Sequence, residues 1–328
     1  MRHNIISEQP STQPAHLSHA RRRRLRGKRL APLWLLLPAL LVIGFVQIYP
    51  ALFTFYLGFF ALEPGSGRYV FRGLGNFQRL LASERFAQSL GHTLIFLSGY
   101  ALLTMTIAMG IALLLRQRVR ISGLAITMIF VPWVLSDVVA GIVWRLFVVP
   151  DYGLFAPFFA NPDLFGAPNG ISVLTAPPPA ALIAGLTFPP APAMLLLIVA
   201  SAWKALPFVT LLLLAALQTV PPEVLESAQI DGAGRWQSFR AITLPLIMPT
   251  AVVALISLII GGINGVGMVF SVTSGGPGTA TTVLSYLLYS IGFGQLDFGL
   301  AAALSVCMSA LNIALVTIIV RLSPVEED

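Results

Sequence analysis

The stretch PEVLESAQIDGAGRWQSFRAITLP, residues 222–245, is the most polar part of the second half of the chain, and long apolar runs flank it on both sides. Its leading proline suits the first turn of a helix, where the missing N–H costs nothing. Glu223 favours the same end through the helix dipole. Asp231 and Gly232 predict the end of this helix, because glycine accepts the left-handed C-terminal turn at little cost. We expect a short helix, a turn and a second short segment at a membrane face.

Four apolar residues, Val224, Leu225, Ala228 and Ile230, make the first predicted helix amphipathic. A stretch this short has nothing of its own against which to bury an apolar edge. The pattern therefore predicts that a soluble partner protein docks on this loop.

Part of this stretch has the spacing E-A-A-x3-G-x9-I-x-L-P, which is carried by Glu226, Ser227, Ala228, Gly232, Ile242, Leu244 and Pro245. The spacing resembles the cytoplasmic loop of binding-protein-dependent ABC importer permeases, with Ser227 in place of the usual second alanine. The resemblance implies that these residues, together with Glu223 and Asp231, form an ATPase-coupling loop.

The longer text of the stretch resembles the sugar-importing branch of that family, the maltose, glycerol-phosphate and trehalose type. Residues 73–77 and 203–208 also resemble the family, as do residues 273–277, where Ser274 departs from the usual T-G-G-G-P. The resemblance covers residues 30–322, and it implies the type I ABC importer permease fold.

Composition excludes a soluble domain. Hydrophobic residues make up 56% of the 328 residues and charged residues only 10%, whereas a soluble domain is about one quarter charged. The chain is expected to be an all-α polytopic membrane protein. Six transmembrane helices of sufficient length are predicted at residues 30–60, 92–115, 121–149, 191–217, 246–271 and 298–321.

The distribution of charge predicts the orientation of these helices. Eight of the 20 Lys and Arg residues lie in residues 1–29 with a single acid, so the net charge of +7 belongs to this segment. A basic tail before the first span is retained in the cytoplasm. We expect a multi-pass protein of the bacterial inner (plasma) membrane with both termini inside. The arginines of residues 61–91 lie on the outer side in this scheme and weigh against it.

The resulting domain organisation is a basic, disordered tail over residues 1–29, a permease domain over residues 30–322 and an acidic tail over residues 323–328. The permease domain contains the coupling loop at residues 219–245. The connection at residues 150–191 is Pro-rich and has no Lys or Arg. It is either a landing surface for a binding protein or a tolerated insertion.

No nucleophile–base arrangement, metal-ligand cluster or phosphate-binding P-loop is found in the sequence. We therefore expect no enzymatic activity and no cofactor bound by this chain. Two energy sources remain open: ATP and Mg²⁺ on a separate ATPase, or an ion gradient acting on intramembrane charges. Asp137 and Arg145 share one predicted helix about two turns apart, so each is expected to pair with another helix or to reach an interface. Asp137 is the candidate for an ion-coupled role.

Substrate contacts are predicted from two helical stripes, and the resemblance places a sugar site in the middle of the membrane on the same helices. The stripes are Ser201, Lys204, Ala205 and Phe208 on the fourth span, and Ser257, Gly261 and Asn264 on the fifth. An aromatic ring, hydroxyls and an amide suit a sugar, and Lys204 would favour an anionic derivative. The alternative is that small residues here only pack helices together.

The resemblance implies a set of partners: a second, homologous permease subunit, two ATPase subunits, and a periplasmic or lipid-anchored solute-binding protein that delivers the sugar. Membrane lipid is expected around the spans. The basic run at residues 21–29 is read as a membrane anchor, with no nucleic-acid partner. The alternative from another functional class is a secondary, ion-coupled solute transporter.

Overall fold

The structure is a computed structural model, and it describes residues 36–62, 68–116, 123–150, 152–159, 172–175, 182–183, 186–187 and 191–323. Both predicted tails lie almost wholly outside these residues, as does most of the 150–191 connection. Within the described residues, five helices are long and apolar enough to cross a membrane: Leu36–Leu57, Glu84–Arg116, Pro192–Gln218, Arg235–Asn264 and Phe298–Leu322. Five of the six predicted spans thus have a continuous helix at or near the expected place.

The first of these helices belongs to a unit of its own, Met1–Tyr56, and the remaining elements form a second unit, Leu57–Asp328. The first unit contains a π-helical turn, Gly44–Ile48, followed by α2, Tyr49–Leu57. Phe45 stacks on Tyr49, and Tyr49 stacks on Phe53, with ring centroids 6.1 and 6.3 Å apart. This ladder at every fourth residue is a consequence of helical periodicity.

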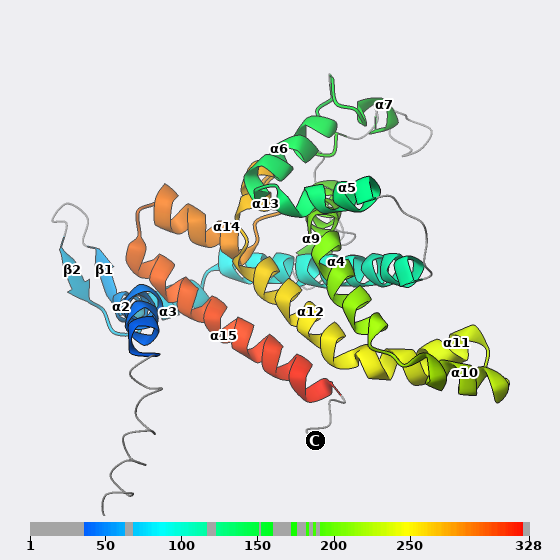
Figure 1. Ribbon diagram of the computed structural model, residues 1–328. Helices are drawn as coiled ribbons and strands as arrows, with labels where there is room; N and C mark the ends of the chain where they lie inside the picture. The colour runs from blue at the N-terminus through cyan, green and yellow to red at the C-terminus, as the bar shows by residue number, and fades with distance from the viewer. Residues whose placement is uncertain are drawn as a thin grey trace, which may run out of the picture. The chain divides into compact units, whose positions relative to one another are not determined.

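The second unit is built around α9, Pro192–Gln218, which packs along α4, Glu84–Arg116, and also contacts α12, Leu244–Asn264 (Figure 1). Close approach of α4 and α9 is possible because small residues lie between them. Ala108 and Ala200 are fully buried, and a Cβ added at Gly99 would lie 2.8 Å from the Ile198 side chain. Small residues at helix contacts are the usual means of packing in a membrane.

The prediction of one helix at residues 121–149 is wrong. The structure has two shorter helices there, α5, Gly123–Val134, and α6, Asp137–Phe147. Pro132 cannot donate a backbone hydrogen bond inside α5. Ser136 has an extended conformation, and its side chain caps α6 by accepting a hydrogen bond from the backbone N–H of Val139, with a donor–acceptor distance of 3.3 Å. The break therefore has a local cause that overall hydropathy does not reveal.

Both ends of the fifth predicted span, 246–271, also differ in the structure. Its helix begins earlier, because α11, Arg235–Ser238, continues through a π-helical turn, Phe239–Thr243, into α12. It ends earlier too, at Asn264, where Gly265 is extended. A separate short helix, α13, Gly267–Val272, follows.

Two short hairpins depart from the expected all-α composition. The pairing of β1, Phe60–Leu62, with β2, Tyr69–Phe71, is antiparallel, as is that of β3, Leu182–Ile183, with β4, Leu186–Thr187. The remaining short elements are α3 at Gly75–Leu81, α7 at Ala156–Phe159, α14 at Leu284–Tyr289 and a π-helical turn at Ser290–Gly294.

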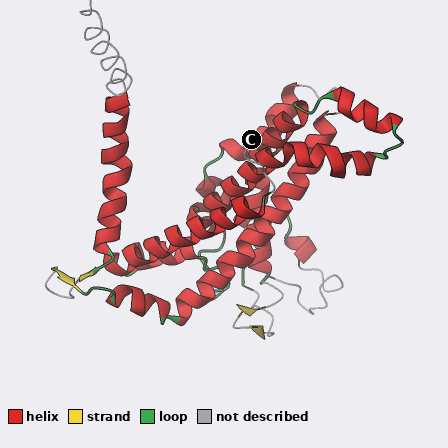
Figure 2. Ribbon diagram, turned by 90° about the horizontal axis from the view of Figure 1, so that it is seen from below, coloured by secondary structure: helices red, strands yellow, loops and turns green. Residues whose placement is uncertain are grey.

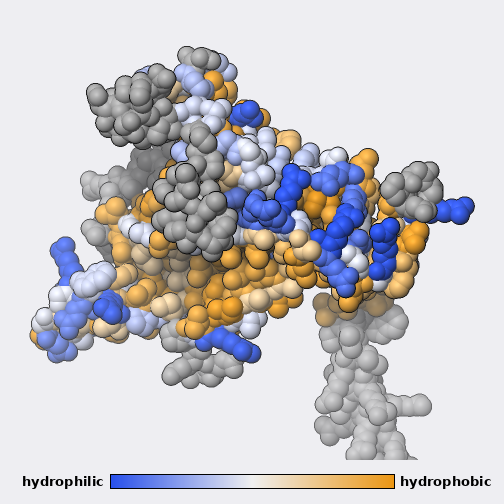
Figure 3. All heavy atoms as spheres, turned by 180° about the vertical axis from the view of Figure 1, so that it is seen from behind, coloured by the Kyte–Doolittle hydropathy of each residue, from blue (hydrophilic) through white to orange (hydrophobic). Residues whose placement is uncertain are grey.

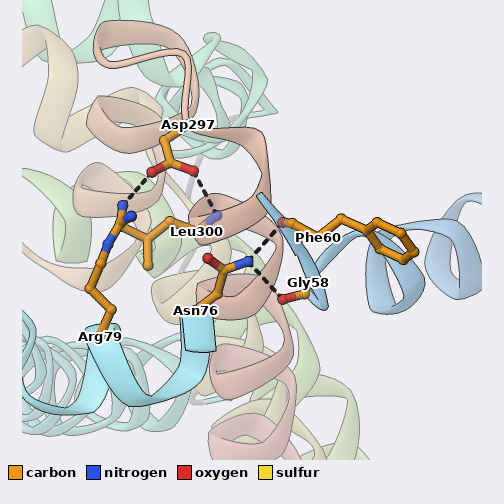
Figure 4. Close-up of polar contacts among 6 residues, drawn as sticks. All are labelled: Gly58, Phe60, Asn76, Arg79, Asp297 and Leu300. Atoms are coloured by element: carbon orange, nitrogen blue, oxygen red, sulfur yellow. Dashed lines mark hydrogen bonds and ion pairs between the residues drawn. The ribbon is translucent and has the colours of Figure 1, made fainter. Parts of the chain in front are cut away.

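The first hairpin is held to α3 and to the start of α15, Phe298–Leu322, by a polar network (Figure 4). The buried Asn76 side chain donates hydrogen bonds to the backbone oxygens of Gly58 and Phe60, at 2.9 and 2.8 Å. Asp297 forms an ion pair with Arg79 and also caps α15 through the backbone N–H of Leu300. One of the arginines that weighed against the predicted orientation is therefore neutralised locally.

The surface of the second unit is divided along the helices. On the face seen in Figure 3, apolar side chains cover the long helices, and hydrophilic side chains gather at the α10–α11 end and at the opposite end around α3. The helix α10 is Pro222–Ile230. An apolar band between two polar ends is the arrangement that a lipid bilayer requires.

Candidate functional site

A cavity of about 230 Å³ lies where α4, α5, α6, α9, α12 and α13 meet. Its walls are formed by Phe96 and Tyr100 from α4, Trp133 from α5, Asp137 from α6, Ser201, Lys204, Ala205 and Phe208 from α9, Ser257, Leu258, Gly261 and Gly262 from α12, Gly265 beyond it, and Met268 and Val269 from α13.

Six of the seven residues predicted from the two stripes line this one cavity: Ser201, Lys204, Ala205, Phe208, Ser257 and Gly261. Helical periodicity brings each stripe to one side of its helix, and packing of α9 on α12 brings the two stripes together. Asn264 is the exception. Its side-chain amide is exposed and donates a hydrogen bond to the backbone oxygen of Ile260 at 2.8 Å, and it does not line the cavity.

Two helix breaks lie at the cavity wall, because α6 begins at Asp137 and α13 begins at Gly267. These two helices pack closely. A Cβ added at Gly267 would lie 2.6 Å from the Cβ of Asp137, and one added at Gly141 would lie 1.8 Å from the Ser271 hydroxyl. Interrupted helices are tolerated at membrane depth where they line a cavity. Both breaks lie beside the cavity, and α6 and α13 approach each other closely there.

Two charged side chains line the cavity, and they pair with each other. The Lys204 ammonium lies 2.8 Å from a carboxylate oxygen of Asp137, with exposed side-chain fractions of 20% and 44%. Asp137 therefore pairs with another helix, as the sequence predicted. Its position in the first turn of α6 also places negative charge at the favourable end of the helix dipole.

Aromatic rings form two faces of the cavity. Trp133 stacks on Phe208 with centroids 6.0 Å apart and an interplanar angle of 14°. Phe96 stacks on Tyr100 at 5.5 Å. The two predicted stripes do not include Trp133, Phe96 and Tyr100, because these residues lie on other helices. A tryptophan beside a proline in the third predicted span was the available signal for the first of them.

The hydroxyl of Ser201 is a polar group at the cavity wall. The residue is only 8% exposed, and its Oγ has no hydrogen-bond partner among the described residues. The Ser257 hydroxyl instead bonds the backbone oxygen of Val253 at 2.9 Å. A buried hydroxyl without a partner is costly unless something else binds it, so Ser201 is suited to contact a bound polar molecule.

The predicted loop helix is present as α10, Pro222–Ile230, with a proline in its first turn. It ends as expected at Asp231. Gly232 has φ +84°, and the two hydrogen bonds of a Schellman motif close the turn. They run from Gly232 N–H to Gln229 O at 3.1 Å and from Ala233 N–H to Ala228 O at 2.9 Å.

The apolar edge of α10 is arranged differently from the prediction. Ala228 is buried, and Leu225 is half-buried against the core of the long helices, so this edge is partly covered within the chain. Val224 and Ile230 are exposed. The helix α11 also packs beside α10.

The α10–α11 hairpin extends beyond the ends of the long helices (Figure 2). Glu223, Glu226, Ser227, Asp231 and Gly232 are exposed on it. Ile230 and Trp236 are 86% and 71% exposed. Ile242, Leu244 and Pro245 lie instead in the continuous helix that leads into α12. The loop residues of the motif thus separate into an exposed part and a part that connects to the helix lining the cavity.

A second cavity of about 500 Å³ lies between this hairpin and the end of α4. Leu113 and Arg116 come from α4, whereas Leu225, Gln229 and Phe239 come from the hairpin. The hairpin and the end of α4 are thus separated by a space at this place.

Residues 107–325 match the family model described as "Binding-protein-dependent transport system inner membrane component". The chain is similar to a trehalose/maltose transport system permease protein, MalF, of Thermococcus litoralis, with 29% identity over 90% of this chain and 94% of the relative. It is also similar to an sn-glycerol-3-phosphate transport system permease protein, UgpA, of Agrobacterium fabrum, with 34% identity over 75% of this chain and 78% of the relative.

Among solved structures, the fold is similar to a chain of a bacterial alginate ABC transporter in complex with an alginate pentasaccharide-bound periplasmic protein. The TM-score is 0.69 at 24% identity, over 90% of this chain and 95% of that chain. This likeness shows that the two chains share a fold.

Proposed function

The chain belongs to the family of binding-protein-dependent transport system inner membrane components, and we propose that it forms one half of a membrane pore for a sugar or a sugar derivative. As a permease subunit of an ABC importer it does not need an ion gradient, so the ion-coupled alternative is set aside. Asp137, the candidate for ion coupling, is engaged in an ion pair with Lys204.

The observation that supports a sugar is the convergence of two kinds of group on one cavity. The stacked rings of Trp133 and Phe208 suit the apolar face of a sugar ring, and the free Ser201 hydroxyl suits its hydroxyl edge. Relatives named for trehalose and maltose or for glycerol phosphate are consistent with this substrate class.

The remaining subunits that we propose are those of a binding-protein-dependent importer, and the exposed loop supports the ATPase among them. Exposed apolar side chains at Ile230 and Trp236, beside the acidic Glu226, offer a docking surface for an ATPase that carries the ATP and Mg²⁺. A pore needs a second, homologous permease, and therefore a second ATPase. A periplasmic or lipid-anchored solute-binding protein delivers the sugar, and this chain itself binds no cofactor.

Affinity purification of the tagged chain from native membranes tests the proposal. ATPase subunits are expected to co-purify, and ATP hydrolysis by the reconstituted complex is expected to rise when sugar-loaded binding protein is added. Screening sugars in this assay identifies the substrate. Purification without any ATPase, together with uptake in vesicles that lack ATP but have an ion gradient, would refute the proposal.

The proposed orientation, with both termini cytoplasmic, gives a labelling prediction. In a Cys307→Ser background, Thr175→Cys is expected to react with an impermeant maleimide in spheroplasts, whereas Gln237→Cys reacts only after lysis. Both side chains are exposed, and Cys307 is the single native cysteine. The two positions lie in the 150–191 connection and in the coupling loop. The reverse pattern of labelling would invert the topology.

A further inference from the structure

The charge balance of the cavity depends on one residue. A lysine without a counter-ion in a partly buried cavity attracts anions, because charge-assisted hydrogen bonds are about twice as strong as hydrogen bonds between neutral groups. Lys204 is not alone, since a carboxylate oxygen of Asp137 lies 2.8 Å from its ammonium. These two are the charged groups among the described residues that line the cavity, so their formal charges cancel.

The backbone and Cβ of Asp137 are closely packed at this position. It occupies the first turn of α6, directly after the capping residue Ser136. On its other side α13 packs so closely that a Cβ at Gly267 would lie 2.6 Å from the Asp137 Cβ. The carboxylate is therefore anchored at the cavity wall beside Lys204, and an anionic ligand there would meet its negative charge.

The ion pair still leaves hydrogen-bonding capacity for an uncharged ligand. Lysine has three N–H donors and a carboxylate has about four acceptor sites, so one contact between them does not exhaust either group. The Asp137 side chain is 44% exposed. A sugar hydroxyl can donate to Asp137 while another accepts from Lys204, beside the free hydroxyl of Ser201.

We propose that Asp137 determines substrate charge: as the built-in counter-ion of Lys204, it makes this cavity select uncharged sugars over phosphorylated or otherwise anionic ones. The inference rests on the proposed sugar-importing function and narrows its substrate class. The names of the relatives do not decide this point, because they include both an uncharged disaccharide and a phosphorylated glycerol.

A competition between glucose and glucose 6-phosphate tests it, because the two differ only in the phosphate. Saturation-transfer difference NMR on the purified complex detects weak ligands, and a non-hydrolysable ATP analogue fills the ATPase sites. Wild type is expected to favour glucose. Asp137→Asn frees the Lys204 charge and is expected to shift the ratio at least about tenfold towards glucose 6-phosphate, the size of one charged hydrogen bond.

The double variant Asp137→Asn/Lys204→Met separates charge from structure. It removes both charges, so the gain for glucose 6-phosphate is expected to disappear again. Asp137→Glu keeps the counter-ion and is expected to retain the wild-type preference. A purely structural clamp between α6 and α9 predicts instead that the single and double variants behave alike.

The inference is overturned by a wild type that binds glucose 6-phosphate as well as glucose, by an Asp137→Asn variant that gains no binding of the phosphate, or by a double variant that keeps the gain. ATPase subunits are assayed in the same samples. Absence of ATPase subunits from the wild-type complex counts against the proposed function. Their presence, with no shift towards glucose 6-phosphate in Asp137→Asn, counts only against the role of Asp137.

Discussion

Replacing Gly232 by valine is expected to lower transport strongly while leaving the chain inserted in the membrane. Gly232 has φ +84° and closes the turn between α10 and α11. A residue with a Cβ meets a penalty of about 1–2 kcal/mol in this left-handed conformation. The turn is exposed and loosely packed, so it can relieve that strain by opening, which would re-aim α10 and its exposed apolar side chains.

The expected result of Gly232→Val is loss of ATPase subunits on purification and uptake in vesicles reduced about 5- to 30-fold, the factor that the strain of about 1–2 kcal/mol implies. Gly234→Val is the matched control. Gly234 lies two residues further along, is also exposed, and has φ −70° and ψ 163°, which valine adopts readily. Wild-type retention of the ATPase in Gly232→Val, or equal loss in both variants, would contradict the assignment of this turn to coupling.

The helix α10 could be predicted from sequence because its signals are local. A proline at the start and a glycine at the end define α10, and both act within one turn of the chain. The apolar edge was less well predicted, because burial of Ala228 depends on α11 folding back beside α10. Periodicity alone cannot supply that contact.

At the cavity too, local spacing was predicted, whereas contacts between helices were not. Helical spacing grouped six residues from α9 and α12 that line one cavity, since residues on one stripe share a face. Asn264 does not line the cavity, because α12 ends there and its amide bonds the backbone of the preceding turn. The pairing of Asp137 with Lys204 joins two helices far apart in sequence, and no local pattern specifies which charge meets which.

Both helix breaks at the cavity were missed because long apolar segments lie on both sides of them. Window hydropathy measures how well a segment suits lipid, and it does not measure whether its backbone hydrogen bonds are continuous. Pro132 and Ser136 in one span, and Gly265 in the other, carried the missing information. The breaks place Asp137 and Gly267 opposite each other. Transport is therefore expected to be sensitive to substitutions at the contact between α6 and α13.

Gly267→Ala is accordingly expected to lower transport at least about tenfold without loss of the ATPase subunits. The added Cβ would lie 2.6 Å from the Cβ of Asp137, which is fixed to the backbone, so α13 and α6 must separate. The Asp137–Lys204 pair at the cavity wall then loses its geometry.

Gly110→Ala in α4 is the control for this change, because a Cβ there meets nothing within 4 Å. Sugar uptake in vesicles and ATPase retention are measured together for both variants. Retention of the ATPase subunits distinguishes Gly267→Ala from Gly232→Val, since the first variant disturbs the cavity and the second disturbs the α10–α11 hairpin.

Wild-type uptake in Gly267→Ala would show that the α6–α13 contact can open without affecting the cavity. Loss of the ATPase in that variant would mean instead that the two sites are not separable, because the helix from Arg235 to Asn264 runs from the coupling hairpin to the cavity.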